Sequence, residues 1–227
     1  MKIREVAITA TDLDSVADFY RDVLQLPVST TPGRVSVEIG TGRLVVTEGE
    51  PFAGVHHLAF GISPHDFETA RRWLEGRVEL LRLNGSEIIE GPAGWDSRSL
   101  YFRGPEGIVL ELIARRADAG IPAGNGERPS LFSISEVGLG VADVGRAAAD
   151  LRDSFGLPPF PPQLTQFAPT GGHDGLFIVA DIDRIWFLTE SDYPARGPLA
   201  VHIEAGRRGK LSLGPFIDIE ATGSLDG

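Results

Sequence analysis

The chain has 227 residues, which is enough for one large domain or two ordinary ones with a buried core. It carries 21 Lys and Arg against 32 Asp and Glu, and this net charge of −11 argues against nucleic-acid and membrane-surface partners. The absence of cysteine excludes disulfides, thiolate nucleophiles and cysteine-held metals, so any metal needs His, Asp, Glu or backbone oxygen as ligands. Because no apolar run approaches the ~18 residues of a spanning helix and no signal peptide is evident, we expect a cytoplasmic protein.

The first part of the chain predicts a strand, a helix and further strands. Residues 4–10 alternate between two faces, as in a half-buried strand. Thr11 and Asp12 can cap a helix with apolar side chains at helical spacing, which Leu26-Pro27 ends. Short β-rich runs follow at 35–39 and 44–47.

Three further units repeat this order. The second begins at His57, opens its helix at Ser63-Pro64 and is expected to have strands near 80–83, 98–103 and 108–114. The third spans about 133–190 with a helix from Val144 to Phe155, and the fourth, 199–222, has strands but no helical period. We therefore expect two domains, 1–116 and 131–227, joined by a Gly- and Pro-rich linker at 117–130.

An offset of 131 residues superposes the two halves. Residues 5–27 and 136–158 share eight identities in 23 positions without a gap, and Glu5 falls on Glu136. A fixed offset indicates a duplicated supersecondary unit. Because a strand–helix–strands unit cannot bury both faces of its sheet alone, the copies are expected to pair around a cleft, the first two with each other within residues 1–116.

Three segments of the chain resemble the vicinal oxygen chelate superfamily, which includes glyoxalase I, extradiol dioxygenases and bleomycin-binding resistance proteins. The segments are ATDLDSVADFYRDVLQLP, HHLAF and SLYFRGPEGIVLEL. The resemblance covers residues 3–114 well and 133–222 more loosely. It implies an α+β fold of tandem βαβββ modules paired into curved mixed sheets, with the last module degenerate.

The same resemblance implies that Glu5, His57 and Glu111 bind a divalent metal ion. Small residues flank the first two on their strand faces, which favours an open cavity over a packed layer. One His with two carboxylates favours Mn, Ni, Zn or Mg, whereas Fe(II) oxygen chemistry usually has two His and one carboxylate. The alternative is that each residue is only a polar side chain at the edge of a strand.

Two residues are candidates for catalysis. Tyr101 stands ten residues before Glu111 and resembles the active-site tyrosine of extradiol dioxygenases in spacing; it can equally be an aromatic residue of the cleft wall. Glu5, or Glu111, would move a proton between substrate and solvent. An extra histidine of those dioxygenases has no counterpart within residues 6–55.

These features predict a metal-dependent enzyme of the glyoxalase type, an isomerase or lyase acting on a small oxygen-chelating substrate. The alternatives are an Fe(II) extradiol dioxygenase and a non-catalytic, drug-binding protein of the bleomycin-resistance type. The second half contains a weak copy of the metal-ligand pattern, at Glu136, His202 and Asp218 or Glu220. The favoured interpretation is that this half is degenerate and structural. The sequence leaves open whether the protein is a homodimer.

Overall fold

The computed structural model describes residues 1–223 and contains the four expected units in chain order. The first two are complete βαβββ modules. Unit 1 consists of β1 (Lys2–Ala10), α1 (Leu13–Asp18) with a π-helical turn (Phe19–Val23), β2 (Val28–Thr31), β3 (Arg34–Ile39) and β4 (Gly42–Glu48). Unit 2 consists of β5 (His57–Ile62), α2 (Phe67–Leu74), β6 (Ile89–Glu90), β7 (Ser97–Arg103) and β8 (Val109–Arg115), with short 3₁₀ turns at Pro64–Asp66, Pro105–Gly107 and Arg116–Asp118.

The second half is reduced, as its weaker sequence pattern indicates. Unit 3 keeps its helix and consists of β9 (Leu131–Val141), α3 (Val144–Phe155), β10 (Phe167–Gly172) and β11 (Gly175–Asp181). Unit 4 has three strands without a helix: β12 (Leu199–Ala205), β13 (Gly209–Leu213) and β14 (Ile217–Gly223). The α+β class with one large, curved, mixed sheet is therefore confirmed.

The helices begin where the sequence predicts them because their capping residues repeat. Asp12 accepts a hydrogen bond from the Ser15 amide, and its counterpart 131 residues later, Asp143, accepts one from the Arg146 amide. Gly156 then ends α3 in the left-handed conformation, at φ 73°. The expected strand at 80–83 is reduced to two isolated bridges, Leu80 with Phe102 and Leu83 with Ser86, and β2 is not predicted from the sequence.

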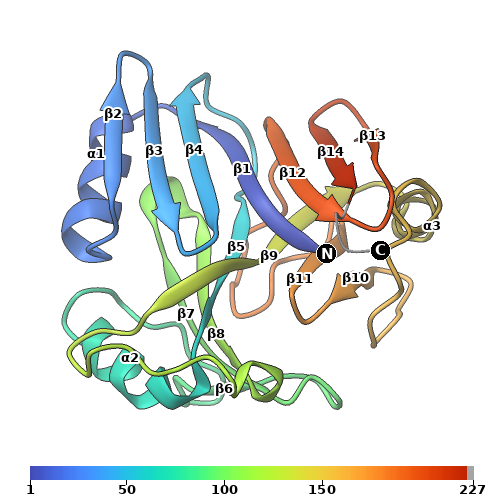
Figure 1. Ribbon diagram of the computed structural model, residues 1–227. Helices are drawn as coiled ribbons and strands as arrows, with labels where there is room; N and C mark the ends of the chain where they lie inside the picture. Colours follow the sequence, from blue (N-terminus) through green and yellow to red (C-terminus); the bar gives the residue numbers. More distant parts are fainter. Residues whose placement is uncertain (224–227) are drawn as a thin grey trace.

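Each unit has the same internal order, in which its first and last strands lie side by side and parallel: β1 with β4, β5 with β8, β9 with β11 and β12 with β14. The units then join through their first strands. β1 is antiparallel to β12, and β5 is antiparallel to β9, as Figure 1 shows. Unit 1 therefore pairs with unit 4, and unit 2 with unit 3.

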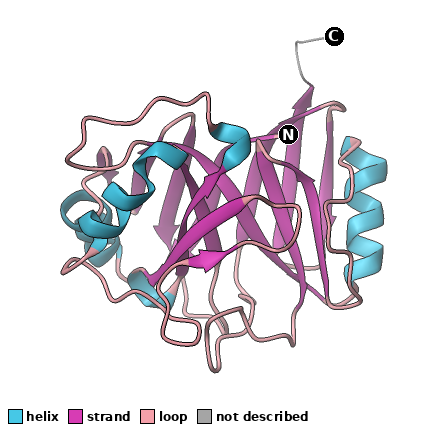
Figure 2. Ribbon diagram, turned by 90° about the horizontal axis from the view of Figure 1, so that it is seen from below, coloured by secondary structure: helices cyan, strands magenta, loops and turns pink. Residues whose placement is uncertain are grey.

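This crossed pairing differs from the expectation that units 1 and 2 pair within residues 1–116. Between the two unit pairs, β1 and β9 share a single register position, Ile3 opposite Ile134. The helices lie outside the strands, with α3 at one end and the others at the opposite end (Figure 2). The concave surfaces are thus formed by one unit from each half of the sequence.

Residues 117–130 are attached to unit 2 rather than free of it. The buried carboxylate of Asp66 accepts hydrogen bonds from the amides of Gly124 and Ser130. The Ser63 hydroxyl donates to the Ile121 carbonyl at 2.7 Å. Apart from the short turn at its start, this segment forms no helix or strand, so these bonds fix its course.

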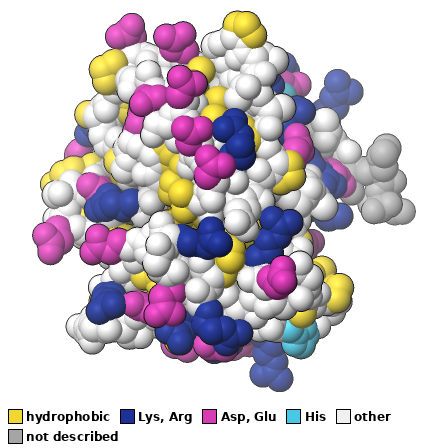
Figure 3. Space-filling model, turned by 90° about the vertical axis from the view of Figure 1, so that its left-hand side faces the viewer, with side chains coloured by type: hydrophobic (Ala, Val, Ile, Leu, Met, Phe, Trp, Pro, Cys, Tyr) yellow, Lys and Arg dark blue, Asp and Glu magenta, His cyan; other side chains and the backbone are white. Residues whose placement is uncertain are grey.

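The surface on the side of units 1 and 2 carries charges of both signs. In Figure 3 acidic and basic side chains are interspersed on this face, with hydrophobic side chains scattered between them. Such a mixed face lacks the clustered cations that bind a phosphate backbone. Within residues 1–223, no helix is long and apolar enough to cross a membrane.

Gly40 provides a stability prediction. It lies in the β3–β4 turn at φ 57°, and a β-carbon there would lie 2.0 Å from the Phe132 backbone. We expect Gly40→Ala to lower the free energy of unfolding by more than about 2 kcal/mol, because strain and a backbone clash combine. Gly33→Ala is the matched control, since Gly33 has φ 70° but open space around it. Equal losses of the two variants in urea unfolding would contradict this.

Candidate metal site

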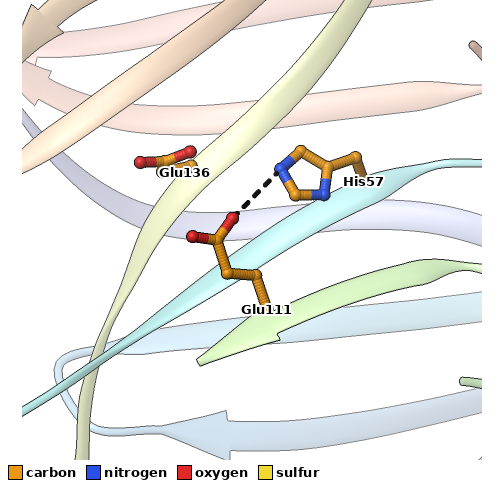
Figure 4. Close-up of side chains that lie close together, drawn as sticks. All are labelled: His57, Glu111 and Glu136. Carbon is orange, nitrogen blue, oxygen red and sulfur yellow. Dashed lines mark ion pairs between the residues drawn. The ribbon is translucent and has the colours of Figure 1, made fainter. Parts of the chain in front are cut away.

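Strand register places two carboxylates around one small residue. Ala59 of β5 pairs with Glu111 of β8 on one side and with Glu136 of β9 on the other. Paired residues point to the same face of a sheet, and His57, two residues before Ala59, shares that face. Each of the three side chains offers a ligand atom, and these atoms lie within 4.8 Å of one another (Figure 4).

The imidazole and one carboxylate present lone pairs to each other. His57 Nδ1 lies 3.2 Å from the Val109 carbonyl oxygen, so the tautomer that donates there leaves Nε2 as an acceptor. Nε2 lies 3.6 Å from Glu111 Oε2, which is buried and has no hydrogen-bond partner among the described residues. A proton or a metal ion between these two acceptors would satisfy both of them.

Arg115 places a positive charge beside the cluster of His57, Glu111 and Glu136, which forms the polar floor of a cavity. Its guanidinium is 1% exposed and donates to Glu136 Oε1 and to the Ser135 hydroxyl. Arg115 and Glu111 lie four residues apart on β8, so both side chains project from the same face. The ion pair orients Glu136 and leaves its other oxygen for a ligand.

Burial shifts the pKa of each group at this floor towards the neutral form. It lowers the pKa of His57, although the nearby Glu136 opposes the shift. It raises the pKa of Glu111, against the effect of the neighbouring Ser99 and Tyr101 hydroxyls, and raises that of Glu136 to about 7. The pKa of Tyr101 is also raised well above its usual value. Burial therefore makes the charged forms of these groups costly unless a cation lies close to them.

The three residues lie in a cavity of about 370 Å³ with a polar floor and aromatic walls. Tyr101 faces Glu111 across the β7–β8 register, and its ring is stacked on the His57 ring at 6.2 Å between centroids. Trp186 also packs against the imidazole, with 5.4 Å between ring centroids, and donates its indole N–H to the Val55 carbonyl. Trp95 is buried in the wall of the cavity.

The donor set fits a divalent cation. Ligand atoms about 2.1 Å from a tetrahedral ion lie about 3.4 Å apart, close to the 3.6 Å between His57 Nε2 and Glu111 Oε2. The unpartnered Oε2 of Glu111 is a buried acceptor that such an ion would satisfy. His57, Glu111 and Glu136 are therefore the residues that would bind a metal here.

Solved structures with this architecture were found over the whole chain. A putative dioxygenase from Bacillus subtilis matches with a TM-score of 0.66 and 14% identity, covering 98% of this chain and 86% of that one. Two variants of glyoxalase I from Zea mays match with TM-scores of 0.58 and 0.55, at 12% and 16% identity. They cover 97% and 88% of this chain, and 93% and 74% of their own.

The chain has the fold of glyoxalase I and of this putative dioxygenase. At these identities the similarity concerns the fold alone. No family model and no curated protein matches the sequence. Residue roles within this fold therefore depend on the geometry of the chain itself.

The structure brings His57 and Glu111 together, as expected, but places Glu5 elsewhere. Glu5 lies on β1 in the sheet formed by units 1 and 4, where it forms an ion pair with Arg43, its register partner on β4. The reason is the crossed pairing, because β5 meets β9 instead of β1. The third carboxylate is Glu136, the residue onto which Glu5 falls in the internal repeat.

The corresponding position in the other unit pair does not form a second cluster. His202 lies opposite Glu5, so it is the counterpart of Ala59 and not of His57. Glu220 lies next to it on β14, but His202 is exposed and Glu5 is bound by Arg43. Among residues 1–223, the one group of three side chains close enough to hold a metal ion is His57, Glu111 and Glu136.

From the sequence, Glu136 is assigned only to a weak second copy of the site, and Arg115 is not identified as a residue of the site. The 131-residue offset already carried the signal for Glu136, since it marks the equivalent position of a partner module. Arg115 gave a weaker signal, an arginine at the end of an apolar run, a position that usually lies at the surface. Only the pairing of β5 with β9 shows that both belong to one floor.

Proposed function

We propose that this protein is a metal-dependent enzyme of the glyoxalase type, an isomerase or lyase acting on a small substrate that chelates the metal through oxygen. The proposal depends chiefly on one observation: His57 Nε2 and Glu111 Oε2 face each other at 3.6 Å, Oε2 has no hydrogen-bond partner among residues 1–223, and Glu136 lies beside them. The fold supports it, since Zea mays glyoxalase I has the same architecture.

The residues around the floor have distinct roles in this proposal. A divalent ion held by His57, Glu111 and Glu136 would polarise a substrate oxygen as a Lewis acid. The carboxylates of Glu111 and Glu136 are the groups placed to accept a proton from a substrate carbon and return it. The Tyr101 hydroxyl is placed to donate a hydrogen bond to a developing oxyanion. Aromatic walls exclude water from this chemistry.

Two other functions each have one observation in their favour. Tyr101 lies across from Glu111, which favours an extradiol dioxygenase containing Fe(II). Arg115 already neutralises Glu136, which favours a non-catalytic binding protein without a metal. In such a binding protein the aromatic cavity would hold a ligand by packing alone.

Metal analysis tests the proposal directly. Protein prepared without a histidine tag and dialysed against Mn²⁺, Ni²⁺, Zn²⁺, Mg²⁺ or Fe²⁺ in turn should retain one equivalent of at least one ion per chain. α-Hydroxycarbonyl compounds in D₂O, followed by proton NMR, should then exchange their α-proton only with the loaded protein.

Three outcomes would contradict the proposal. Retention of no ion by any preparation would favour the binding protein. Oxygen uptake with catechol by anaerobically loaded Fe²⁺ protein would favour the dioxygenase. A bound ion without any α-proton exchange across the series would exclude the glyoxalase type.

A further inference from the structure

Arg184 lines the candidate cavity at its rim. It follows β11 in the turn after Asp181, and its guanidinium carbon lies 4.7 Å from the centre of the Phe167 ring. This position is half-buried, whereas Glu111 and Glu136 at the floor are fully buried. The cavity therefore has one cation at its mouth and a separate polar cluster at its base.

Arg184 has no counter-ion among residues 1–223. Of the neighbouring acidic residues, Asp183 pairs with Arg196 and Asp192 with Arg103. Asp181 accepts a hydrogen bond from the Asp183 amide and forms no ion pair with Arg184. Glu90, which also lines the cavity, forms no ion pair with it within 4.0 Å. Burial lowers the pKa of Arg184, and among residues 1–223 no carboxylate opposes this shift. Half-burying a guanidinium without an acceptor costs free energy that an anionic ligand would recover.

The space between Arg184 and the floor suits a flat ring. Buried indole and aliphatic side chains form the walls, and Phe187 and Leu164 lie near the opening. The wall residues are Trp95, Phe167, Ile178 and Trp186. Aromatic walls favour an aromatic ligand through stacked or edge-to-face contacts. A single cation matches one negative charge, and the acidic floor disfavours a dianion such as an aryl phosphate.

We propose that the cavity takes a small aromatic carboxylate, whose carboxylate pairs with Arg184 while its ring packs against Trp95 and Trp186. The proposal deepens the proposed function, since it names the substrate class for the same site. Arg184 is then a specificity-determining residue, because it selects the acid over a neutral isostere.

Calorimetric titration with 4-hydroxybenzoate, 4-hydroxybenzamide and phenyl phosphate tests this inference. The wild-type protein should bind the benzoate at least about tenfold more tightly than the amide, because a charge-assisted hydrogen bond distinguishes them. It should also prefer the benzoate to phenyl phosphate. Arg184→Gln should abolish the preference for the acid over the amide, whereas Arg72→Gln, at an exposed arginine of α2, should preserve it.

The metal content of each variant, measured in parallel, separates this inference from the proposed function. If the acid is preferred through Arg184 but no metal is bound, the inference stands and the proposed function fails. If metal is bound but acid and amide bind equally, the inference fails alone. A preference that survives in Arg184→Gln and disappears in Glu111→Gln would place the carboxylate on the metal and overturn the role of Arg184. Tighter binding of phenyl phosphate would overturn the carboxylate class.

Discussion

Replacing Glu111 with Gln should weaken metal binding by more than about 100-fold. Loss of a residue that only orients a metal ligand lowers metal affinity 10- to 100-fold, so loss of a ligand itself should lower it further. Gln keeps the size of the side chain but removes the charge that faces His57 Nε2. Competition titration against a chelator of known affinity, with metal content per chain, measures this effect.

Glu5→Gln is the matched control for Glu111→Gln. Both variants replace a strand glutamate of a βαβββ unit, but Glu5 pairs with Arg43 away from the cluster. Its metal affinity should remain that of the wild type, whereas Glu136→Gln should resemble Glu111→Gln. Loss of binding in Glu5→Gln with retention in Glu136→Gln would show that Glu5 is the ligand and that the assignment to Glu136 is wrong.

Replacing Arg115 with Met should destabilise the protein by about 3–5 kcal/mol. Removal of one partner of a buried ion pair leaves the other charge uncompensated, and here the carboxylate of Glu136 is 3% exposed. The Ser135 hydroxyl loses its partner as well. Urea unfolding followed by tryptophan fluorescence measures the change in the free energy of unfolding.

An exposed pair on α3 provides the comparison for Arg115→Met. Arg146 and Asp150 form an i,i+4 ion pair in water, so Arg146→Met should cost about 0.5 kcal/mol or less. A double variant, Arg115→Met with Glu136→Leu, removes both buried charges and should recover most of the lost stability. A loss below about 1 kcal/mol in Arg115→Met would mean that Glu136 is already neutral in the folded protein.

The architecture could be predicted because its signals are local and repeated. Capping residues such as Asp12 and Asp143 mark where helices begin, and alternating apolar and polar residues mark strands. The four units, and the absence of a helix from the last one, therefore follow from the sequence. β2 and the segment at 80–83 were misjudged because both lie at the outer edge of a unit. Edge strands have few partners and a weak pattern.

The site was predicted in part because two of its residues belong to one unit. His57 and Glu111 lie on neighbouring parallel strands, so their proximity follows from the βαβββ unit itself. The third residue depends on which units pair, and an internal repeat does not determine that, since Glu5 and Glu136 have equivalent surroundings in sequence. Long-range packing determines which units pair: β5 pairs with β9 over many positions, whereas β1 pairs with β9 at one.

The crossed pairing of the units also constrains how the chain is made on the ribosome. The sheet of units 2 and 3 can form once β11 has emerged from the ribosome. One edge of β1, however, has no strand to pair with until β12 (Leu199–Ala205) has been synthesised. At 5–20 residues per second, about 200 residues take roughly 10–40 seconds to synthesise. During that time an uncovered strand edge is open to pairing with a neighbouring nascent chain. Synthesis rate and chaperone supply should therefore affect the yield of this protein more than that of a chain whose adjacent units pair.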